Sequence, residues 1–384
     1  MIIGVPKEIM QDEARVSVTP EVCAHYISLG HTVLMEKDAG EGSYFHDEQY
    51  SSAGAQIVPQ AKEIYDRAEL ILKVKEPQFN KRAGLHEVDM MRQGQYLITF
   101  LHPAAPGNHQ MVNNLAQRGV IAMTLDGIPR IPRTREMDAL ASMSVCAGYK
   151  GVLMACGLLP RFVPGVDTPA GATEPASAMV VGAGVAGLQA LKTLQQLGAR
   201  IYAADIREEA QERARELGAE LVDLTLPDRT GQNKGTAASD EHLDHERGVL
   251  SRLLPGMDLV VLSQLTMGYQ APILVTESMV KTMKPGSVIL DISVDQGGNC
   301  EMTEPGEVVL RHGVHIIGIK NIPGRLPESS TAMFARNVLH LFTYLIRDGV
   351  LRLDRQDEIV RGILTTVDGK VVHAGTLEAM ASRV

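Results

Sequence analysis

The chain contains no tryptophan, and aromatic residues make up only 4% of its 384 positions. Its four cysteines, Cys23, Cys146, Cys156 and Cys300, have neither C-x-x-C spacing nor the density of a disulfide scaffold. The N-terminus lacks the apolar stretch and cleavage site of a signal peptide. The longest uninterrupted apolar stretch, 151–159, is about half as long as a bilayer-spanning helix requires. We therefore expect a cytoplasmic protein with reduced thiols, and we assign no metal site.

A basic surface is missing too. The chain has 37 lysines and arginines against 46 aspartates and glutamates, which gives a formal net charge of −9 at pH 7. Nucleic-acid-binding chains are usually basic, so we expect no nucleic-acid partner. With 45% hydrophobic and 22% charged residues, the composition is that of a globular chain, and its length suits two domains of roughly 100–200 residues each.

The most informative motif is a glycine-rich turn that follows an apolar, strand-like run and precedes helix-forming residues. Gly182 permits the sharp turn, Gly184 leaves the backbone open to a pyrophosphate, and Gly187 lets the helix lie close to the sheet. The start of the helix presents unpaired N–H groups and a partial positive charge to the phosphates. The motif therefore predicts a dinucleotide site, in which Val185 and Ala186 complete the turn.

A carboxylate lies at the end of the next strand-like run, as this kind of site requires. Asp205 follows Gly187 by 18 residues, where it would accept hydrogen bonds from the adenosine ribose and repel a 2′-phosphate. We therefore predict NAD rather than NADP as cofactor, although Arg207 lies close enough to weaken that preference. A glycine-rich loop that binds nothing is the alternative for the turn alone.

Strand-like runs and helix-like segments alternate in two series, one up to about residue 140 and one from about residue 177. This alternation predicts parallel sheets covered by helices. Apolar helical patterns over 143–159 and 329–346 are candidates for the two crossings between the halves. The segment 228–247 has the composition of a mobile surface loop. In the tail, 359–366 has a β-type composition.

These patterns predict an α/β fold of two Rossmann-like, doubly wound parallel-sheet domains with a cleft between them. Residues 1–140 together with 330–384 would form a discontinuous substrate domain. Residues 141–329 would form the NAD-binding domain. Ligands of such folds bind at the carboxyl ends of the strands.

Four polar residues stand where strand-like runs end. Arg15 offers a planar, doubly donating cation for a carboxylate substrate, and Lys75 can add a point charge. His102 titrates near neutrality, as a proton donor and acceptor must. Asp295 could stabilise an iminium or fix the ring of His102. From spacing alone, surface cations, a loop histidine and a close-packed loop carboxylate remain alternatives.

The chain resembles the family that joins alanine dehydrogenase to the NAD-binding subunit of proton-translocating NAD(P) transhydrogenase. The resemblance covers nearly the whole chain. It is carried by the segments 1–8 (MIIGVPKE), 39–42 (AGEG), 73–77 (KVKEP), 271–275 (APILV) and 295–298 (DQGG), together with the glycine-rich turn.

Some segments of this sequence resemble one branch of that family, and other positions resemble the other branch. The stretches 129–131 and 298–301 and the tail from 360 resemble the transhydrogenase subunit. In the loop of that subunit that orients the nicotinamide, this chain keeps Arg130 and Asp138 but has Arg135 in place of the expected Gln. It also has Ala141 in place of a Ser.

The chemical positions resemble alanine dehydrogenase instead. Lys75, His102 and Asp295 occupy its positions for substrate binding, acid/base work and the essential carboxylate, and Arg15 occurs in both branches. Direct hydride transfer between two nicotinamides needs no proton-transferring histidine. Pro103 follows His102 where a Leu is expected, and Phe100 replaces a Tyr of the pocket, so alanine itself is in doubt as substrate.

The resemblance implies that Ser144 and Asn321 contact the pyrophosphate and the nicotinamide side of NAD. We predict an NAD-dependent amino-acid dehydrogenase that acts on a small amino acid or 2-oxo acid and forms a homo-oligomer, a hexamer or a dimer. One alternative is the NAD(H)-binding alpha subunit of transhydrogenase, working with membrane subunits. Another is a catalytically silent NAD-binding regulatory module.

Overall fold

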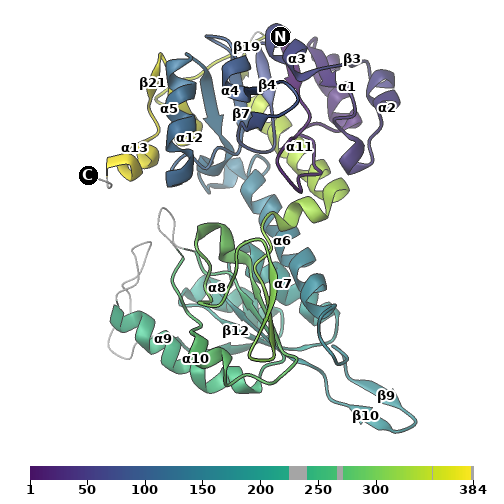
Figure 1. Ribbon diagram of the computed structural model, residues 1–384, viewed down its shortest axis with the longest axis vertical. Coiled ribbons are helices and arrows are strands. Elements are labelled where there is room, and N and C mark those ends of the chain that lie inside the picture. Colours follow the sequence, from purple (N-terminus) through teal and green to yellow (C-terminus); the bar gives the residue numbers. More distant parts are fainter. Residues whose placement is uncertain (225–239, 266–270, 348, 382–384) are drawn as a thin grey trace. The chain divides into compact units, whose positions relative to one another are not determined.

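The computed structural model describes residues 1–224, 240–265, 271–347 and 349–381 (Figure 1). The chain divides into two compact units. Unit 1 comprises residues 1–143 and 324–384, and unit 2 comprises residues 144–323. The predicted boundaries, at 140/141 and 329/330, lie a few residues from these.

Unit 1 is built on an eight-stranded sheet with the order β21-β20-β8-β7-β4-β1-β2-β3. All pairs are parallel except those made by β20 and β21. The strands are β1 (Ile2–Val5), β2 (Thr32–Glu36), β3 (Gln56–Val58), β4 (Leu70–Leu72), β7 (Tyr96–Thr99), β8 (Ile121–Thr124), β20 (Leu364–Val367) and β21 (Lys370–Val371).

Helices cover this sheet. The sheet residues Ile71, Leu97 and Ala122 share a buried cluster with side chains of α3, α4 and α5. Residues that alternate with these along the strands, such as Leu72 and Ile98, are fully buried as well, as in a sheet covered on both faces. The helices of unit 1 are α1 (Pro20–Ser28), α2 (Asp47–Ser52), α3 (Ala61–Arg67), α4 (Glu87–Met90), α5 (His109–Gln117), α11 (Pro327–Leu345), α12 (Glu358–Ile363) and α13 (Ala374–Ala381).

Unit 2 contains a seven-stranded sheet with the order β13-β12-β11-β14-β15-β17-β16, of which only β16 runs antiparallel. Strand residues alternate between two buried clusters, one shared with α6 (Ala139–Cys156), α7 and α8 and the other with α9 and α10. The elements are β11 (Ser177–Val181), α7 (Val185–Gln196), β12 (Arg200–Ala204), α8 (Glu208–Glu216), β13 (Glu220–Val222), α9 (Asp240–Leu253), β14 (Leu259–Leu262), α10 (Glu277–Val280), β15 (Val288–Asp291), β16 (Val308–Arg311) and β17 (Val314–Ile317). The predicted α/β fold of two parallel-sheet domains is confirmed.

One helix of the described residues, α6 (Ala139–Cys156), is long and apolar enough by composition to cross a membrane, with a mean hydropathy of 1.4. The core helix of a globular protein meets the same test. Ala147, Val152 and Ala155 of α6 belong to the buried cluster on one face of the unit 2 sheet.

Two local predictions were wrong. The run 359–366 begins as a helix, because Asp357 caps the N–H groups of Ile359 and Val360 and so starts α12 before the strand β20. Part of the predicted loop at 228–247 is also helical, since α9 begins at Asp240. The part up to residue 239 lies outside the described residues.

Each sheet has one point at which the order of the strands reverses. In unit 1 the chain moves outward from β1 in one direction through β2 and β3, and in the other through β4, β7 and β8. In unit 2 the corresponding reversal lies between β11 and β14. Ligands of open α/β sheets bind at the carboxyl ends of the strands beside such a reversal.

Candidate functional site

The glycine-rich turn joins β11 to α7 at the strand reversal of unit 2. Gly182 has φ +89°, a conformation that favours glycine. Gly184 is the N-cap of α7 and supplies no side-chain cap to the first N–H groups of the helix. A Cβ on Gly184 would meet only the Nη2 of Arg207, at 3.8 Å. The turn is thus an open cradle of backbone donors that fits a pyrophosphate.

Gly187 holds the helix against the turn. A Cβ at this position would lie 1.9 Å from the carbonyl oxygen of Gly182, a backbone atom that cannot rotate away. We expect Gly187→Ala to displace the turn and weaken NADH binding at least about tenfold, measured by titration of NADH fluorescence. Gly256→Ala is the control, because a Cβ there has no heavy atom within 4 Å. Unchanged affinity in Gly187→Ala would show that the turn does not hold the cofactor.

Asp205 follows β12 and is nearly buried, with a side chain 5% exposed. Its Oδ2 accepts a hydrogen bond from the backbone N–H of Ala183 at 2.7 Å, so it braces the glycine turn. Arg207 donates through Nε at 3.0 Å and through Nη2 at 2.7 Å to the same carboxylate. This hydrogen bonding raises the pKa of Arg207. Asp205 thus neutralises Arg207, and a 2′-phosphate would find no unpaired cation in this pair.

The other predicted residues of unit 2 lie near strand ends or in α6. Ser144 is half-buried in α6. Asn321 follows β17 in a left-handed conformation, φ +54°, that asparagine tolerates well. Asp295 is exposed in the short 3₁₀ helix Ile292–Gln296 after β15. Val185 and Ala186 are the first two residues of α7.

In unit 1 the candidate residues follow the carboxyl ends of β1, β4 and β7. Arg15 is buried, and its guanidinium is forked to Glu13, with Nε–Oε1 at 2.7 Å and Nη2–Oε2 at 2.5 Å. Its Nη1 donates to the sulfur of Met143 at 2.9 Å. Burial alone would raise the pKa of Glu13, but the charge and hydrogen bonds of Arg15 hold it below its usual value. The double-donor edge predicted to face a substrate is therefore occupied by Glu13.

Lys75 and Glu76 lie beyond β4, in the segment that carries the family-like sequence KVKEP. Both side chains are half-buried. Within the described part of the chain, the ammonium of Lys75 has no carboxylate partner within 4.0 Å. Lys75 is therefore the cation of this site that is available to a carboxylate ligand.

His102 follows β7 and is fixed by Asp126, which follows β8. The ring Nδ1 lies 2.7 Å from Oδ1 of Asp126, and the backbone N–H of His102 donates to Oδ2 at 2.8 Å. These contacts hold the residue at φ +45°, a strained conformation for histidine. Phe100 stacks on the imidazole with ring planes 1° apart. The arrangement leaves Nε2 as the nitrogen for a ligand.

The dyad is electrostatically coupled. Burial would lower the pKa of His102, but the charge and hydrogen bond of Asp126 outweigh it and raise the pKa. Burial would likewise raise the pKa of Asp126, yet the nearby His102 lowers it to about 2. Asp126 thus stays ionised and stabilises an imidazolium. Holding the ring was one of two roles predicted for Asp295, and in the structure Asp126 performs it.

Behind these residues lies a buried cluster of charges. Lys73 contacts Glu8 at 3.2 Å and Glu87 at 3.0 Å, and all three side chains are almost completely buried. Oε1 of Glu8 accepts a hydrogen bond from the N–H of Val74 at 2.6 Å, and Glu87 accepts one from the hydroxyl of Tyr65 at 2.8 Å. The cluster ties β1 and the segment before Lys75 together.

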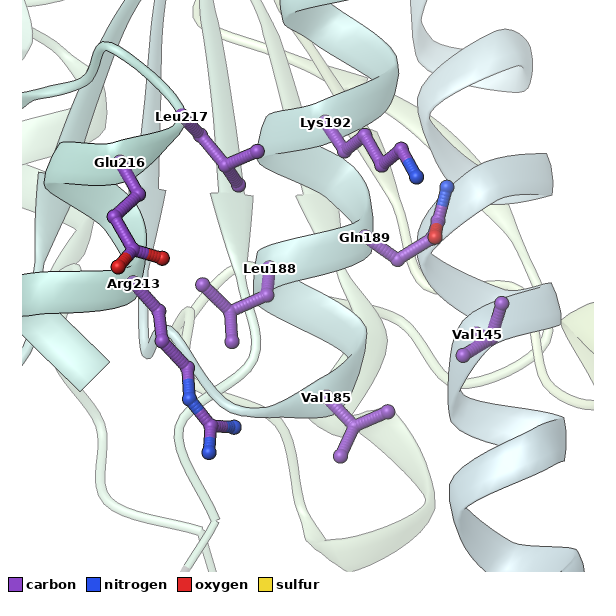
Figure 2. A pocket seen from close by; sticks show the side chains of 8 residues that line it. All are labelled: Val145, Val185, Leu188, Gln189, Lys192, Arg213, Glu216 and Leu217. Carbon is purple, nitrogen blue, oxygen red and sulfur yellow. The ribbon is translucent and has the colours of Figure 1, made fainter. Parts of the chain in front are cut away.

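A groove of about 330 Å³ lies elsewhere in unit 2, on the exposed side of α7 (Figure 2). Leu188 lies between Val145 of α6 on one side and Arg213 and Glu216 of α8 on the other. Val185, one of the residues predicted to complete the glycine-rich turn, lines this groove. Leu188 also packs against the buried cluster that α7 shares with the sheet.

Comparison with known proteins accounts for both parts of the chain. Residues 4–147 match the family description "Alanine dehydrogenase/PNT, N-terminal domain", and residues 151–374 match "Alanine dehydrogenase/PNT, C-terminal domain". The chain belongs to the alanine dehydrogenase/PNT family. The resemblance found in the sequence motifs is thereby confirmed.

The chain is similar to proteins named as transhydrogenase subunits and to proteins named as alanine dehydrogenases. NAD(P) transhydrogenase subunit alpha of Cereibacter sphaeroides is 38% identical over 97% of this chain and 71% of the relative. Alanine dehydrogenase of Methanococcus maripaludis is 31% identical over 99% and 96%. A transhydrogenase from Sinorhizobium meliloti has a TM-score of 0.84 at 32% identity, covering 97% of this chain and 99% of that one. An L-alanine dehydrogenase has 0.83 at 30%, covering 100% and 99%.

Several site residues of this family member were not predicted from sequence. Asp126 could have been, because it follows a strand end like Lys75 and His102. Glu76 follows the predicted residue Lys75, and Glu13 precedes the predicted residue Arg15 by two positions. These sequence positions do not show which side chains contact each other. The burial of Glu8 and Glu87 around Lys73 has no local sequence signal.

Proposed function

We propose that the chain is an NAD-dependent amino-acid dehydrogenase, which interconverts a small amino acid and its 2-oxo acid. The observation that carries this proposal is the His102–Asp126 dyad. A histidine held by a half-buried carboxylate, with its second ring nitrogen not engaged by that carboxylate, is suited to moving protons. Lys75 lies at the next strand end of the same sheet, where it can bind a carboxylate.

Unit 2 would hold NAD, which supplies the hydride acceptor when it is bound. Gly182, Gly184 and Gly187 with Val185 and Ala186 would cradle the pyrophosphate. Ser144 and Asn321 would contact the pyrophosphate and the nicotinamide side of NAD, as the family resemblance implies. Asp205 would face the ribose, and its pairing with Arg207 supports NAD over NADP.

Unit 1 would act on the substrate. Lys75 would bind its carboxylate. Arg15, which is buried and bonded to Glu13 and Met143, would contribute its positive charge rather than a free donor edge. As an imine is hydrated, neutral His102 takes a proton on Nε2, and Asp126 stabilises the imidazolium that forms. For Asp295 we retain the role of supporting the cationic intermediate, since it is exposed after the end of β15.

The test is NADH formation by the purified protein with NAD and a panel of L-amino acids at alkaline pH. Turnover of one of them supports the dehydrogenase and gives its substrate class. No turnover across the panel, with NADH still bound, would contradict it and would leave the silent NAD-binding module or the transhydrogenase subunit.

A second candidate, the NAD(H)-binding alpha subunit of transhydrogenase, is favoured by the higher identity to that branch. Arg130 and Asp138 also lie 4.0 Å apart, although Arg135 and Ala141 depart from the branch. Hydride exchange between NADH and an NADP analogue in the presence of transhydrogenase membrane subunits, with no amino-acid turnover, would support it.

We also propose a homo-oligomer. The hairpin of β9 (Val166–Thr168) and β10 (Gly171–Thr173) extends from unit 2 with no buried residue (Figure 1). Isolated two-stranded hairpins are marginal in water, so this arm is expected to pack on a second copy. We expect light scattering to report an oligomer for the intact chain and a smaller species when residues 166–173 are replaced by a short glycine linker. Equal masses would contradict this role of the hairpin.

A further inference from the structure

We propose that Glu76 binds the amino group of the substrate and thereby restricts unit 1 to α-amino acids and the imines derived from them. The inference rests on the proposed dehydrogenase function and adds a residue and a selectivity to it. It concerns the ground-state amine, whereas the role kept for Asp295 concerns the cationic intermediate.

The first observation is an unsatisfied oxygen. Oε2 of Glu76 is shielded from solvent and accepts no hydrogen bond from any residue of the described chain. Nor does any lysine, arginine or histidine that the structure describes lie within ion-pair distance of this carboxylate. A buried polar atom without a partner costs about 1–3 kcal/mol, and in native proteins such atoms mark sites where a ligand or water completes the bonding.

The second observation is where this oxygen lies. Burial and Asp126 have the largest effects on the pKa of His102: burial lowers this pKa and Asp126 raises it. The next two effects come from Lys75, which lowers the same pKa, and from Glu76, which raises it. The backbone agrees with this, because β4 and β7 pair in parallel and the hydroxyl of Thr99 donates to the backbone carbonyl of Lys75 at 2.9 Å. The segment that carries Lys75 and Glu76 therefore runs beside the end of β7 that leads into His102. One offers a positive pole and the other a negative pole beside the proton-transferring group.

An α-amino acid complements these poles. It carries a carboxylate and an ammonium on one carbon, so the carboxylate can meet Lys75 while the ammonium donates to Glu76, with the reacting carbon near His102. A 2-hydroxy acid offers only a neutral hydroxyl to Glu76, and charge-assisted hydrogen bonds are about twice as strong as neutral ones. A 2-oxo acid alone offers no donor at all and leaves the oxygen unsatisfied.

A purely electrostatic role for Glu76, raising the pKa of His102, is the competing explanation. The two explanations predict changes in different measured quantities. An amine-binding group changes the KM for ammonium in reductive amination, whereas a tuning group changes the pH at which activity rises. The experiment therefore has to measure both.

The variant is Glu76→Gln, which keeps the shape and removes the charge. Its control is Asp66→Asn, a surface carboxylate on α3 that pairs with exposed Lys62. With the amino acid that the panel identifies and its 2-oxo acid as substrates, we expect the KM for ammonium to rise at least tenfold in Glu76→Gln, while the KM for the 2-oxo acid changes less than twofold. By calorimetry, binding of that amino acid weakens at least tenfold, while oxalate, which has no amino group, binds as before or more tightly.

Three outcomes overturn the proposal. They are an unchanged KM for ammonium, an equal rise in the KM for ammonium and in the KM for the 2-oxo acid, or a shift only in the pH at which activity rises. Glu76→Asp, which withdraws the charge by one methylene, covers the case in which the glutamine variant does not fold. It should raise the KM for ammonium severalfold and keep the pH limb. If the wild-type protein turns over no amino acid and binds no oxalate, the proposed function itself fails, and the role of Glu76 falls with it.

Discussion

Replacing His102 by alanine is expected to lower kcat for amino-acid oxidation by about 10²–10⁴-fold, the usual contribution of a general acid or base. NADH should still bind, because the residues proposed to hold it all belong to unit 2. Stopped-flow or steady-state absorbance of NADH measures the first quantity, and fluorescence titration the second. His25→Ala, an exposed histidine of α1, is the control and should keep full activity. A His102→Ala variant that retains more than a tenth of the activity would exclude His102 as the proton-transferring group.

Asp126→Asn tests the same dyad through its pH profile. Oxidation requires neutral His102, so activity rises as the pH passes the pKa of this residue. Asp126 raises that pKa, although burial acts against it, so removing its charge should move the rising limb to lower pH. The maximal rate should also fall, because the ring loses its orienting partner. If activity in Asp126→Asn rises at the same pH as in the wild type, a group other than His102 controls this rise.

Lys73→Met is expected to destabilise the protein by about 3–5 kcal/mol, the cost of leaving buried carboxylates without their counterion. The methionine keeps most of the volume, so the loss reports charge rather than a cavity. Urea unfolding followed by far-UV circular dichroism measures it, since no tryptophan is present as a fluorescent probe. Lys62→Met, which removes an exposed pair with Asp66, should change stability by no more than about 0.5 kcal/mol. A loss below about 1 kcal/mol for Lys73→Met would mean that water solvates the cluster.

The same cluster gives a pH dependence with a definite sign. Burial raises the pKa of Glu8 to about 7, even though Lys73 acts to lower it. An acid whose pKa is raised on folding stabilises the protein below its unfolded pKa, and that contribution is lost as the pH rises through the folded value. We therefore expect the Glu8 contribution to fall between about pH 4.5 and 7. The loss caused by Lys73→Met should accordingly be larger at pH 8 than at pH 5.

The sequence was sufficient to predict two parallel-sheet domains and many of the runs that form their strands. Alternating apolar runs identify strands because buried parallel strands are apolar throughout, and polar residues just beyond them fall at the edge where ligands bind. Lys75 and His102 were predicted as site residues in this way, and the structure places them beyond the neighbouring strands β4 and β7. The pairing of side chains was not predictable, because it depends on competition between neighbours in space. The contact of Arg15 with Glu13 and the double hydrogen bond of Arg207 to Asp205 are examples of such pairings.

Helix and strand were confused where the two compositions overlap. Ile359, Val360 and Ile363 are β-branched and suggest a strand, yet they are buried on one side of α12. The deciding residue is Asp357, whose carboxylate accepts from the first N–H groups of the helix. A capping residue thus outweighed a weak intrinsic preference.

Because unit 2 is inserted between β8 and β20, which pair in the sheet of unit 1, the order of synthesis on the ribosome matters. The edge of β8 stays uncovered until the last part of the chain emerges, and an open strand edge invites association with other chains. Unit 2 is contiguous and can fold while unit 1 is still incomplete. A truncation that removes β20 should therefore cause aggregation of the nascent chain even though every residue of the glycine-rich turn is present.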